Sequence, residues 1–195
     1  MDTTRPSTTA ARSEAPDGHQ LIAAGLEGHG ITHVFAIGGT PIHETLAACL
    51  RHGIRVVGVH NQQAAAMMAA SYNYMTGRLS AAVILSAGPA IANSVTGLLV
   101  AHDNDWPLLV IGGCRPLDMR GRGAFQDLDA VPIVGSITRF AARLDRPEEA
   151  IGFYRRALEL EPANGATLDA LEQIHTRLEQ WRPLADRKAY FALLA

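Results

Sequence analysis

The chain has 195 residues, of which 48% are hydrophobic and 18% are charged, and its formal net charge is −2. This length suits one ordinary domain, alone or with a small appendage. The near-neutral charge excludes binding to nucleic acid or to an anionic membrane by electrostatic attraction. No apolar stretch approaches the roughly 18 residues of a membrane span, and the polar start lacks the apolar core of a secretion signal, so we expect a cytoplasmic protein.

Residues 1–18 are rich in Thr, Ser, Ala and Pro and show no apolar periodicity. Such a composition buries too little apolar surface to offset the conformational entropy lost on ordering, so we predict a disordered tail. From residue 19 onward, short amphipathic helices alternate with apolar, β-branched runs, which predicts an α/β layered domain. Three runs without polar alternation are expected to be strands buried on both faces: 56–59, 82–85 and 108–111.

Glycines and alanines carry further structural signals. The glycines that close LEGHG, LRHG and MTG are expected to end helices, because glycine reaches positive φ at little cost. The alanine-rich face of residues 64–70 is expected to let a helix pack close to a sheet or to another backbone. Cys49 and Cys114 stand alone in the sequence and are expected to be buried free thiols.

Residues 148–195 are charged and helical in character, without β-branched runs. Ala150, Tyr154, Ala157 and Pro162 have a spacing that resembles the second helix and terminal proline of a tetratricopeptide repeat. We therefore predict a short helical appendage of this kind. Because so few repeats cannot bury a core by themselves, the appendage is expected to dock on the α/β body or on another chain.

The common signatures of phosphate loops, zinc proteases, serine hydrolases and paired-cysteine metal sites are absent from the sequence. Four other stretches, in order, resemble the pyrimidine-binding module of thiamine-diphosphate-dependent enzymes, in the acetolactate synthase and oxalyl-CoA decarboxylase branch. They are GITHVFAIGGTPI (Gly30–Ile42), VHNQQAAAMMAASYNYMTGR (Val59–Arg78), LSAGPAIANSVTGLLVAHDNDWPLLVIGG (Leu85–Gly113) and GAFQDLD (Gly123–Asp129). The resemblance implies a three-layer parallel sheet flanked by helices over residues 19–147.

In that family, the module packs against a second, diphosphate-binding module, usually across a dimer interface, and the cofactor lies between the two. The second module's GDG motif, whose following Asn helps to hold magnesium, has no match in these 195 residues. The resemblance therefore implies thiamine diphosphate shared with a partner chain in a homo- or hetero-oligomer. It also implies that the partner holds Mg²⁺ and that the substrate is a small molecule.

Gln62 occupies the most informative position. The family's motif has His-Glu where this chain has Asn61-Gln62, and the family's Glu exchanges a proton with a ring nitrogen of the aminopyrimidine. A carboxamide can donate a hydrogen bond to that nitrogen but cannot relay its proton at neutral pH. We predict that Gln62 stands at the catalytic position and binds the cofactor. The alternative is a polar residue in the first turn of a helix, with Asn61 as its N-cap.

The resemblance implies further cofactor-binding residues, namely Gly38, Gly39, Gly88, Pro89 and Asn93. Gly38 and Gly39 match a turn beside the active site, and Gly88-Pro89 matches a turn that brings backbone near the pyrimidine ring. For the glycine pair the alternative is an ordinary turn after a strand. For Asn93 it is simple helix capping or packing.

Phe125 and Gln126 match a family segment that reaches toward the substrate across the dimer. The alternative is a loop anchored by one buried aromatic side chain. His60 and His102 are expected near the strand ends that face the cleft.

Two functions remain open from the sequence. The first is the pyrimidine-binding subunit of a split decarboxylase or carboligase that acts on a small 2-oxo acid, or on oxalyl-CoA. The second is a noncatalytic regulatory or scaffold paralogue that has lost the catalytic Glu. Gln62 favours the second, whereas the FQD segment and the glycine turns favour the first.

Overall fold

The computed structural model describes residues 17–145, together with residues 149, 151–153, 155, 165, 168, 171 and 172. Within this part of the chain, four strands form one sheet in the order β2-β1-β3-β4, and each neighbouring pair is parallel. The strands are β1 (His33–Ala36), β2 (Arg55–Gly58), β3 (Ala81–Leu85) and β4 (Leu109–Gly112). The sheet confirms the predicted α/β class. The predicted disordered tail and repeat-like appendage lie almost wholly outside the described residues.

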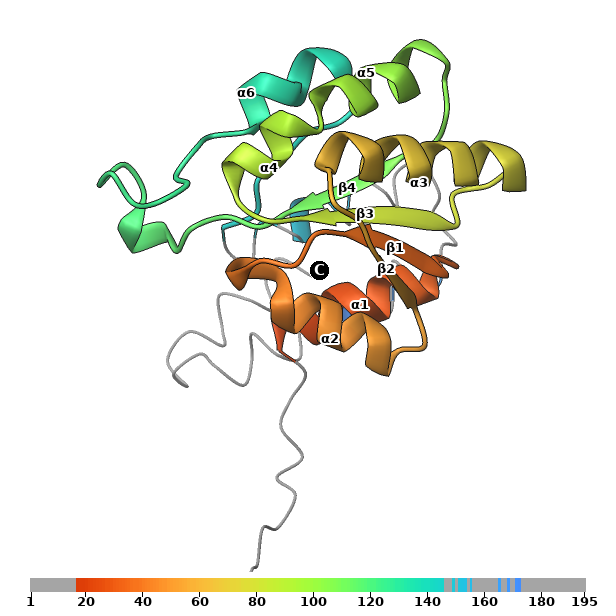
Figure 1. Ribbon diagram of the computed structural model, residues 1–195. Coiled ribbons are helices and arrows are strands. Elements are labelled where there is room, and N and C mark those ends of the chain that lie inside the picture. The colour runs from red at the N-terminus through yellow and green to blue at the C-terminus, as the bar shows by residue number, and fades with distance from the viewer. Residues whose placement is uncertain are drawn as a thin grey trace, which may run out of the picture.

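Helices cover both faces of this sheet (Figure 1). The described helices are α1 (Gly18–Gly28), α2 (His43–Arg51), α3 (Gln62–Thr76), α4 (Gly88–Asn93), α5 (Val95–Asp103) and α6 (Val131–Val134), with 3-10 turns η1 (Thr40–Ile42), η2 (Leu117–Met119) and η3 (Gly135–Ile137). Figure 1 shows α1 and α2 against one face and α3, α4 and α5 over the other. The predicted three-layer arrangement is therefore present.

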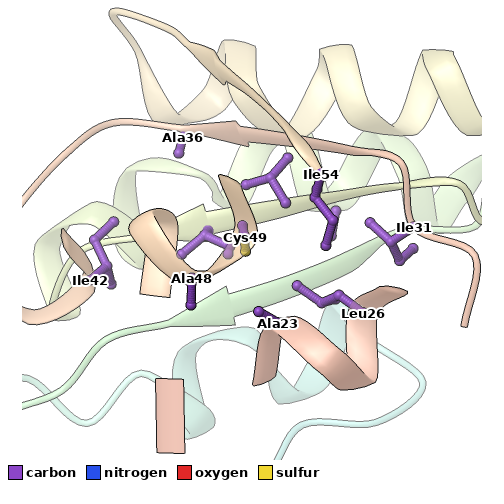
Figure 2. Close-up of a cluster of buried hydrophobic side chains, with 11 residues drawn as sticks. Ala23, Leu26, Ile31, Ala36, Ile42, Ala48, Cys49 and Ile54 are labelled. Atoms are coloured by element: carbon purple, nitrogen blue, oxygen red, sulfur yellow. The ribbon is translucent and has the colours of Figure 1, made fainter. Parts of the chain in front are cut away.

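Two hydrophobic clusters hold the layers together. The first lies between the sheet and the α1–α2 pair and includes Ala23, Leu26, Ala48 and the buried thiol of Cys49 (Figure 2). The second lies between the sheet and α3 and is built largely from alanine and valine side chains. Burial also raises the pKa of the Cys49 thiol, because the thiolate loses hydration there. Cys49 is thus the buried free thiol expected, whereas Cys114 is exposed, contrary to prediction.

The strands differ in how deeply they are buried. Every residue of β3 is buried, in agreement with its uninterrupted apolar sequence. β2 and β4 are only partly buried, so the prediction that all three apolar runs are covered on both faces is wrong for these two. They occupy the outer positions of the described sheet, where fewer neighbouring side chains exclude water.

Small residues set the distance between α3 and its neighbours. Ala65, Ala66, Ala69 and Ala70 of α3 are completely buried, which confirms the close packing predicted for this face. A Cβ atom added to Gly97 of α5 would lie 2.6 Å from the Cβ of Ala66. The two helices therefore approach so closely that only glycine fits at this contact. The glycines predicted to end helices, Gly30, Gly53 and Gly77, all have positive φ.

Asn73, near the end of α3, is a completely buried polar residue. Its Nδ2 donates to the carbonyl oxygens of Ala81 at 2.9 Å and Pro107 at 2.8 Å. Its Oδ1 accepts from the backbone N–H groups of Ser80 at 2.9 Å and Ala81 at 2.7 Å. One side chain thus provides hydrogen-bond partners for backbone N–H and C=O groups where the chain enters β3 and where it approaches β4. The amide nitrogen only donates and the amide oxygen only accepts, as the chemistry of each atom requires.

We predict that Asn73→Ala lowers the free energy of unfolding by about 2–4 kcal/mol, because it leaves several buried backbone groups without partners. Urea denaturation of the full chain measures this change. Asn104→Ala is the control, since Asn104 makes one exposed hydrogen bond and its loss is expected to cost about 0.5 kcal/mol or less. Equal effects of the two substitutions would contradict the prediction.

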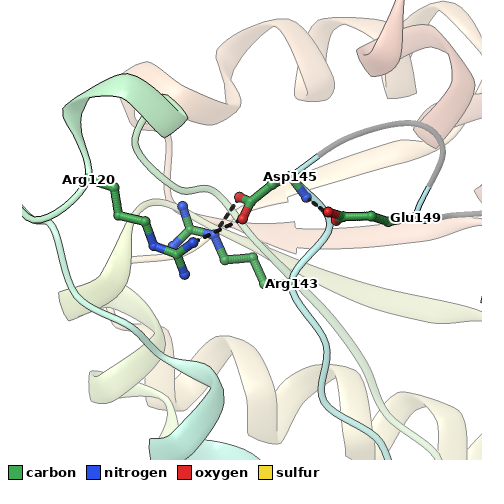
Figure 3. Close-up of polar contacts among 4 residues, drawn as sticks. All are labelled: Arg120, Arg143, Asp145 and Glu149. Carbon is green, nitrogen blue, oxygen red and sulfur yellow. Dashed lines mark hydrogen bonds and ion pairs between the residues drawn. The ribbon is translucent and has the colours of Figure 1, made fainter.

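A cluster of charged residues ties the loop after β4 to the segment that follows η3 (Figure 3). Asp145 accepts from Arg143 Nε at 2.7 Å and from Arg120 Nη1 at 3.0 Å. The backbone N–H of Asp145 donates to Glu149 Oε2 at 2.8 Å. Hydrogen bonding to Arg143 lowers the pKa of the Asp145 carboxyl group, and the same bond raises the pKa of Arg143.

Asp145→Asn is expected to lower the free energy of unfolding at pH 7. Because the carboxyl pKa is lower in the folded chain, its stabilising effect is complete above the ordinary value of about 3.9 and disappears as the pH falls through the folded-state value. The wild type and the variant should therefore converge in acid, as denaturation at several pH values would show. Asp105→Asn, which removes the exposed pair with Arg139, is the control and should change stability little. A difference that persists unchanged at low pH would contradict this account.

Within the residues that the structure describes, no helix combines the length and hydrophobicity of a membrane span.

Candidate functional site

The loops that follow β1, β3 and β4 converge at the carboxyl edge of the sheet (Figure 1). After β1 the chain turns toward α2 on one face, and after β3 it turns toward α4 on the opposite face. In parallel α/β sheets, such a reversal opens a crevice between the two strands, and ligands bind there. β1 and β3 are neighbours, so the reversal lies between Gly38-Gly39 and Gly88-Pro89, and this part of the carboxyl edge is the candidate ligand site.

Close contacts confirm that these loops meet. A Cβ atom on Gly39 would lie 2.6 Å from Ser86 Oγ, although the extended backbone of Gly39 suits any residue. A Cβ atom on Gly113 would lie 3.0 Å from the side chains of Pro41 and Ile42. The glycines are thus needed for space between loops. The space around Gly38 is less restricted, because a Cβ atom there would lie 3.5 Å from His43 Nε2, an ordinary van der Waals distance.

Gln62 is the first residue of α3, and Asn61 is its N-cap. The Asn61 side chain accepts from the backbone N–H of Ala64 at 3.0 Å, which confirms the capping role considered from the sequence. Gln62 itself is half-buried. Its position in the first turn is compatible with a site role, because the first turn of α3 lies at the carboxyl edge, directly after β2.

Asn93 meets Gln62 across the two helices. Asn93 Nδ2 donates to Gln62 Oε1 at 2.6 Å, although the residues are 31 positions apart in the chain. Asn93 is the last residue of α4, and the next residue, Ser94, is completely buried with its hydroxyl donating to the carbonyl of Ile91. The structure therefore brings these two predicted site residues into direct contact.

Gly88 and Pro89 form the first turn of α4. Gly88 is buried, and a Cβ atom there would lie 2.3 Å from Leu128 Cβ and 3.2 Å from its Cα. Pro89 is exposed in the position where helices accept proline. Leu128 thereby fixes the segment containing Phe125 and Gln126 against the turn after β3.

Phe125 is 75% exposed, so the alternative of a loop anchored by this buried aromatic residue is wrong. The loop is held instead by Arg115, whose Nε donates to the carbonyl of Phe125 at 2.6 Å and whose guanidinium lies 5.7 Å from the ring centroid. Asp127 Oδ2 accepts from the backbone N–H of Gly121 at 2.6 Å. Gln126 is half-buried at a positive φ of 62°.

The two histidines expected near the cleft lie at opposite edges of the sheet. His60 follows β2 at the carboxyl edge and is exposed. His102 lies in the last turn of α5, just before the chain enters β4, and so belongs to the amino edge. The prediction for His102 is therefore wrong, because α5 runs antiparallel to the strands. Among the described residues, no group of three or more His, Cys, Asp or Glu side chains could hold a metal ion.

Residues 16–133 match the model of a family described as thiamine pyrophosphate enzyme, N-terminal TPP binding domain. The chain belongs to this family. The match confirms the resemblance seen in the sequence and implies thiamine diphosphate as the cofactor. The match ends at residue 133, so it gives no support to the tetratricopeptide-like interpretation of residues 148–195, which lie almost wholly outside the described residues.

Curated relatives agree with this assignment. The chain is 34% identical over 144 residues to a probable acetolactate synthase of Mycobacterium bovis, covering 74% of this chain and 26% of the relative. It is 36% identical over 138 residues to 2-hydroxyacyl-CoA lyase 1 of Homo sapiens, and this match covers 70% of this chain and 24% of the relative. The chain thus spans about a quarter of the length of these relatives.

Three residues that shape the candidate site were not predicted from the sequence: Ser86, Arg115 and Leu128. Ser86 directly follows the apolar run of β3, and a polar residue at the carboxyl end of a parallel strand could have been predicted to lie at the site. Leu128 and Arg115 act through long-range contacts with Gly88 and Phe125, and no local pattern reveals such contacts.

We predict that Gly88→Ala displaces the loop of residues 123–129 while the sheet stays folded. The added methyl group overlaps Leu128, and overpacking of this kind costs about 1–3 kcal/mol, which is enough to open a loop about tenfold more often. Trypsin cleavage after Arg122 should accelerate accordingly. Gly135→Ala is the matched control, because nothing lies within 4 Å of the added atom. Unchanged cleavage in Gly88→Ala would contradict the prediction.

Proposed function

We propose that this chain is the pyrimidine-binding subunit of a split thiamine-diphosphate-dependent decarboxylase or carboligase. A separate chain would carry the diphosphate-binding module and the Mg²⁺ site, and the two chains would form a cytoplasmic hetero-oligomer. The observation that carries the proposal is the carboxyl edge of the sheet, where Leu128 packs against Gly88 and so holds the segment of Phe125 and Gln126 beside the turn after β3. The membership of the chain in the thiamine pyrophosphate enzyme family supports it.

The residues at the carboxyl edge fit an aminopyrimidine. Gln62 offers an amide that can donate to a ring nitrogen. The exposed backbone of Gly38 lies at the same edge of the sheet and carries no side chain. When bound, thiamine diphosphate supplies a carbanion that attacks a carbonyl carbon. In this proposal Gln62 orients the ring, whereas Phe125 and Gln126 face the substrate from the loop that Leu128 fixes.

The names of the relatives narrow the substrate class. Two relatives of the chain carry the names probable acetolactate synthase and 2-hydroxyacyl-CoA lyase 1. We therefore propose a small 2-oxo acid as the substrate, with an acyl-CoA compound as the alternative. The exposed Phe125 ring supplies apolar surface for either substrate.

A noncatalytic scaffold or regulatory paralogue is the second candidate, and the amide of Gln62 favours it. An amide cannot take up and return a proton at neutral pH, and the loss of a positioned acid–base group lowers a rate by about 10²–10⁴-fold. In this alternative, the chain retains the fold and its interaction surfaces but does not catalyse a reaction.

Gln62→Glu distinguishes these candidates. If the site is catalytic but attenuated, the new carboxyl group should accelerate exchange of the thiazolium C2 proton for deuterium by about 10²–10⁴-fold. Proton NMR of thiamine diphosphate with Mg²⁺ measures this rate, on the full chain alone and with a chain that carries the diphosphate module. Gln63→Glu is the matched control, one residue further along α3, and should leave the rate unchanged.

No acceleration in Gln62→Glu, although calorimetry shows that the cofactor binds, would favour the scaffold. If calorimetry detects no cofactor binding with or without the diphosphate-module chain, the enzyme proposal fails.

A further inference from the structure

The helix α3 carries no charged residue from its first position, Gln62, to its last, Thr76. The other long helices among the described residues, α1, α2 and α5, each contain at least one Asp, Glu or Arg residue. A surface helix normally turns a charged stripe toward water, and a helix without one is typical of a buried position. The composition of α3 therefore indicates that its outer face is covered in the assembled protein.

The side of α3 opposite its buried alanines forms a stripe on the surface. We call this the outer stripe, and it consists of Ala64, Met68, Ser71 and Met75. Met75 is 80% exposed and Met68 is 47% exposed, although methionine belongs mainly inside proteins. Beside the stripe, the exposed ring of Tyr74 stacks on Trp106 with 4.9 Å between the ring centroids, which widens the apolar surface. Exposed apolar surface of this kind is typical of a protein–protein interface.

The outer stripe alternates small and large side chains. Its members follow one another at intervals of four, three and four residues, the spacing of the a and d positions in a coiled coil. In an antiparallel pair of α3 helices, Ala64 lies opposite Met75 of the second copy, and Met68 lies opposite its Ser71. A parallel pair would instead place methionine against methionine and leave space between the small residues. The stripe therefore complements itself in size in the antiparallel arrangement.

We propose that the outer stripe binds a second copy of this chain, with the two α3 helices antiparallel across a twofold axis. The absence of charge favours this partner, because a charged surface would lose hydration against α3 without gaining an ion pair, whereas a second α3 brings no charge. The exposed side chains of the stripe and its flanks amount to about 500 Å² per copy, so the pair buries up to about 1,000 Å², the lower end for a specific interface. The dimer is therefore weak and reversible.

The two copies keep their candidate sites apart. In the antiparallel pair the two Gln62 residues lie about 20 Å from each other along the helix axes. The carboxyl edge of each sheet is thus at the opposite end of the interface from that of its partner. The inference does not rest on the proposed function.

Sedimentation equilibrium of the full chain tests the dimer. The wild type should associate reversibly with a dissociation constant of about 1–100 μM, as expected for an interface of this size. Met75→Lys places a charge opposite Ala64 of the second copy and should weaken association at least about tenfold. The Met75 side chain is 80% exposed, so the fold of each copy is unaffected. Leu50→Lys is the matched control, because Leu50 is 61% exposed on α2, across the sheet from α3, and should leave association unchanged.

Disulfide formation tests the antiparallel geometry, in a Cys114→Ser background because Cys114 is exposed. Isotope-labelled Ala64→Cys chains are mixed with unlabelled Met75→Cys chains and oxidised gently. The mixed disulfide should form, because positions 64 and 75 face each other across the pair. Two Met75→Cys chains should not be linked, since their cysteines lie about 16 Å apart along the helix axes, too far for a disulfide. Mass spectrometry of the labelled mixture identifies which chains are joined.

A wild type that stays monomeric well above this concentration range would overturn the inference, as would equal association of Met75→Lys and Leu50→Lys. Disulfides that join Met75→Cys only to itself would also overturn it. If peroxide oxidation of Met75 slows only when a chain with the diphosphate module is added, the stripe belongs to that partner and the inference is wrong. Calorimetry with thiamine diphosphate measures cofactor binding separately, so each of these results leaves the proposed function standing.

Discussion

The close approach of α3 to α5 is the constraint on which the candidate site depends. Gly97 has no room for a methyl group against Ala66, so the two helix axes are held at a distance that only small residues permit. Four residues earlier in the chain in each case, Gln62 at the start of α3 and Asn93 at the end of α4 meet at 2.6 Å. Packing among α3, α4 and α5 thus places two polar side chains together at the carboxyl edge of the sheet.

The second requirement is that loops from different strands pack closely together at the carboxyl edge of the sheet. Glycine at positions 39, 88 and 113 allows Ser86, Leu128 and Pro41 to pack against the backbone of neighbouring loops. The loop with Phe125 is then held by Leu128 and Arg115, so that the aromatic ring stays exposed. An exposed ring of this kind suits contact with a ligand or a second module, which is the role we propose for it.

The sequence predicted the architecture because its signals are local. Apolar β-branched runs gave the strands, and glycines at helix ends gave Gly30, Gly53 and Gly77. Burial of β2 and β4 was overestimated, since neither run reveals its outer position in the sheet. The placement of His102 was wrong, and the contacts of Asn73 and Leu128 were not foreseen, because each depends on which elements become neighbours after folding.

The central claim is that the carboxyl edge between β1 and β3 receives the pyrimidine ring. Backbone amide chemical shifts of the isotope-labelled full chain, recorded as thiamine diphosphate and Mg²⁺ are added, test it most directly. If the ring binds at this edge, the largest changes should fall on Gly38, Gly39, Gln62 and Gly88. Changes confined to the amino edge, around His33 and Ala81, or spread evenly over the surface, would contradict it.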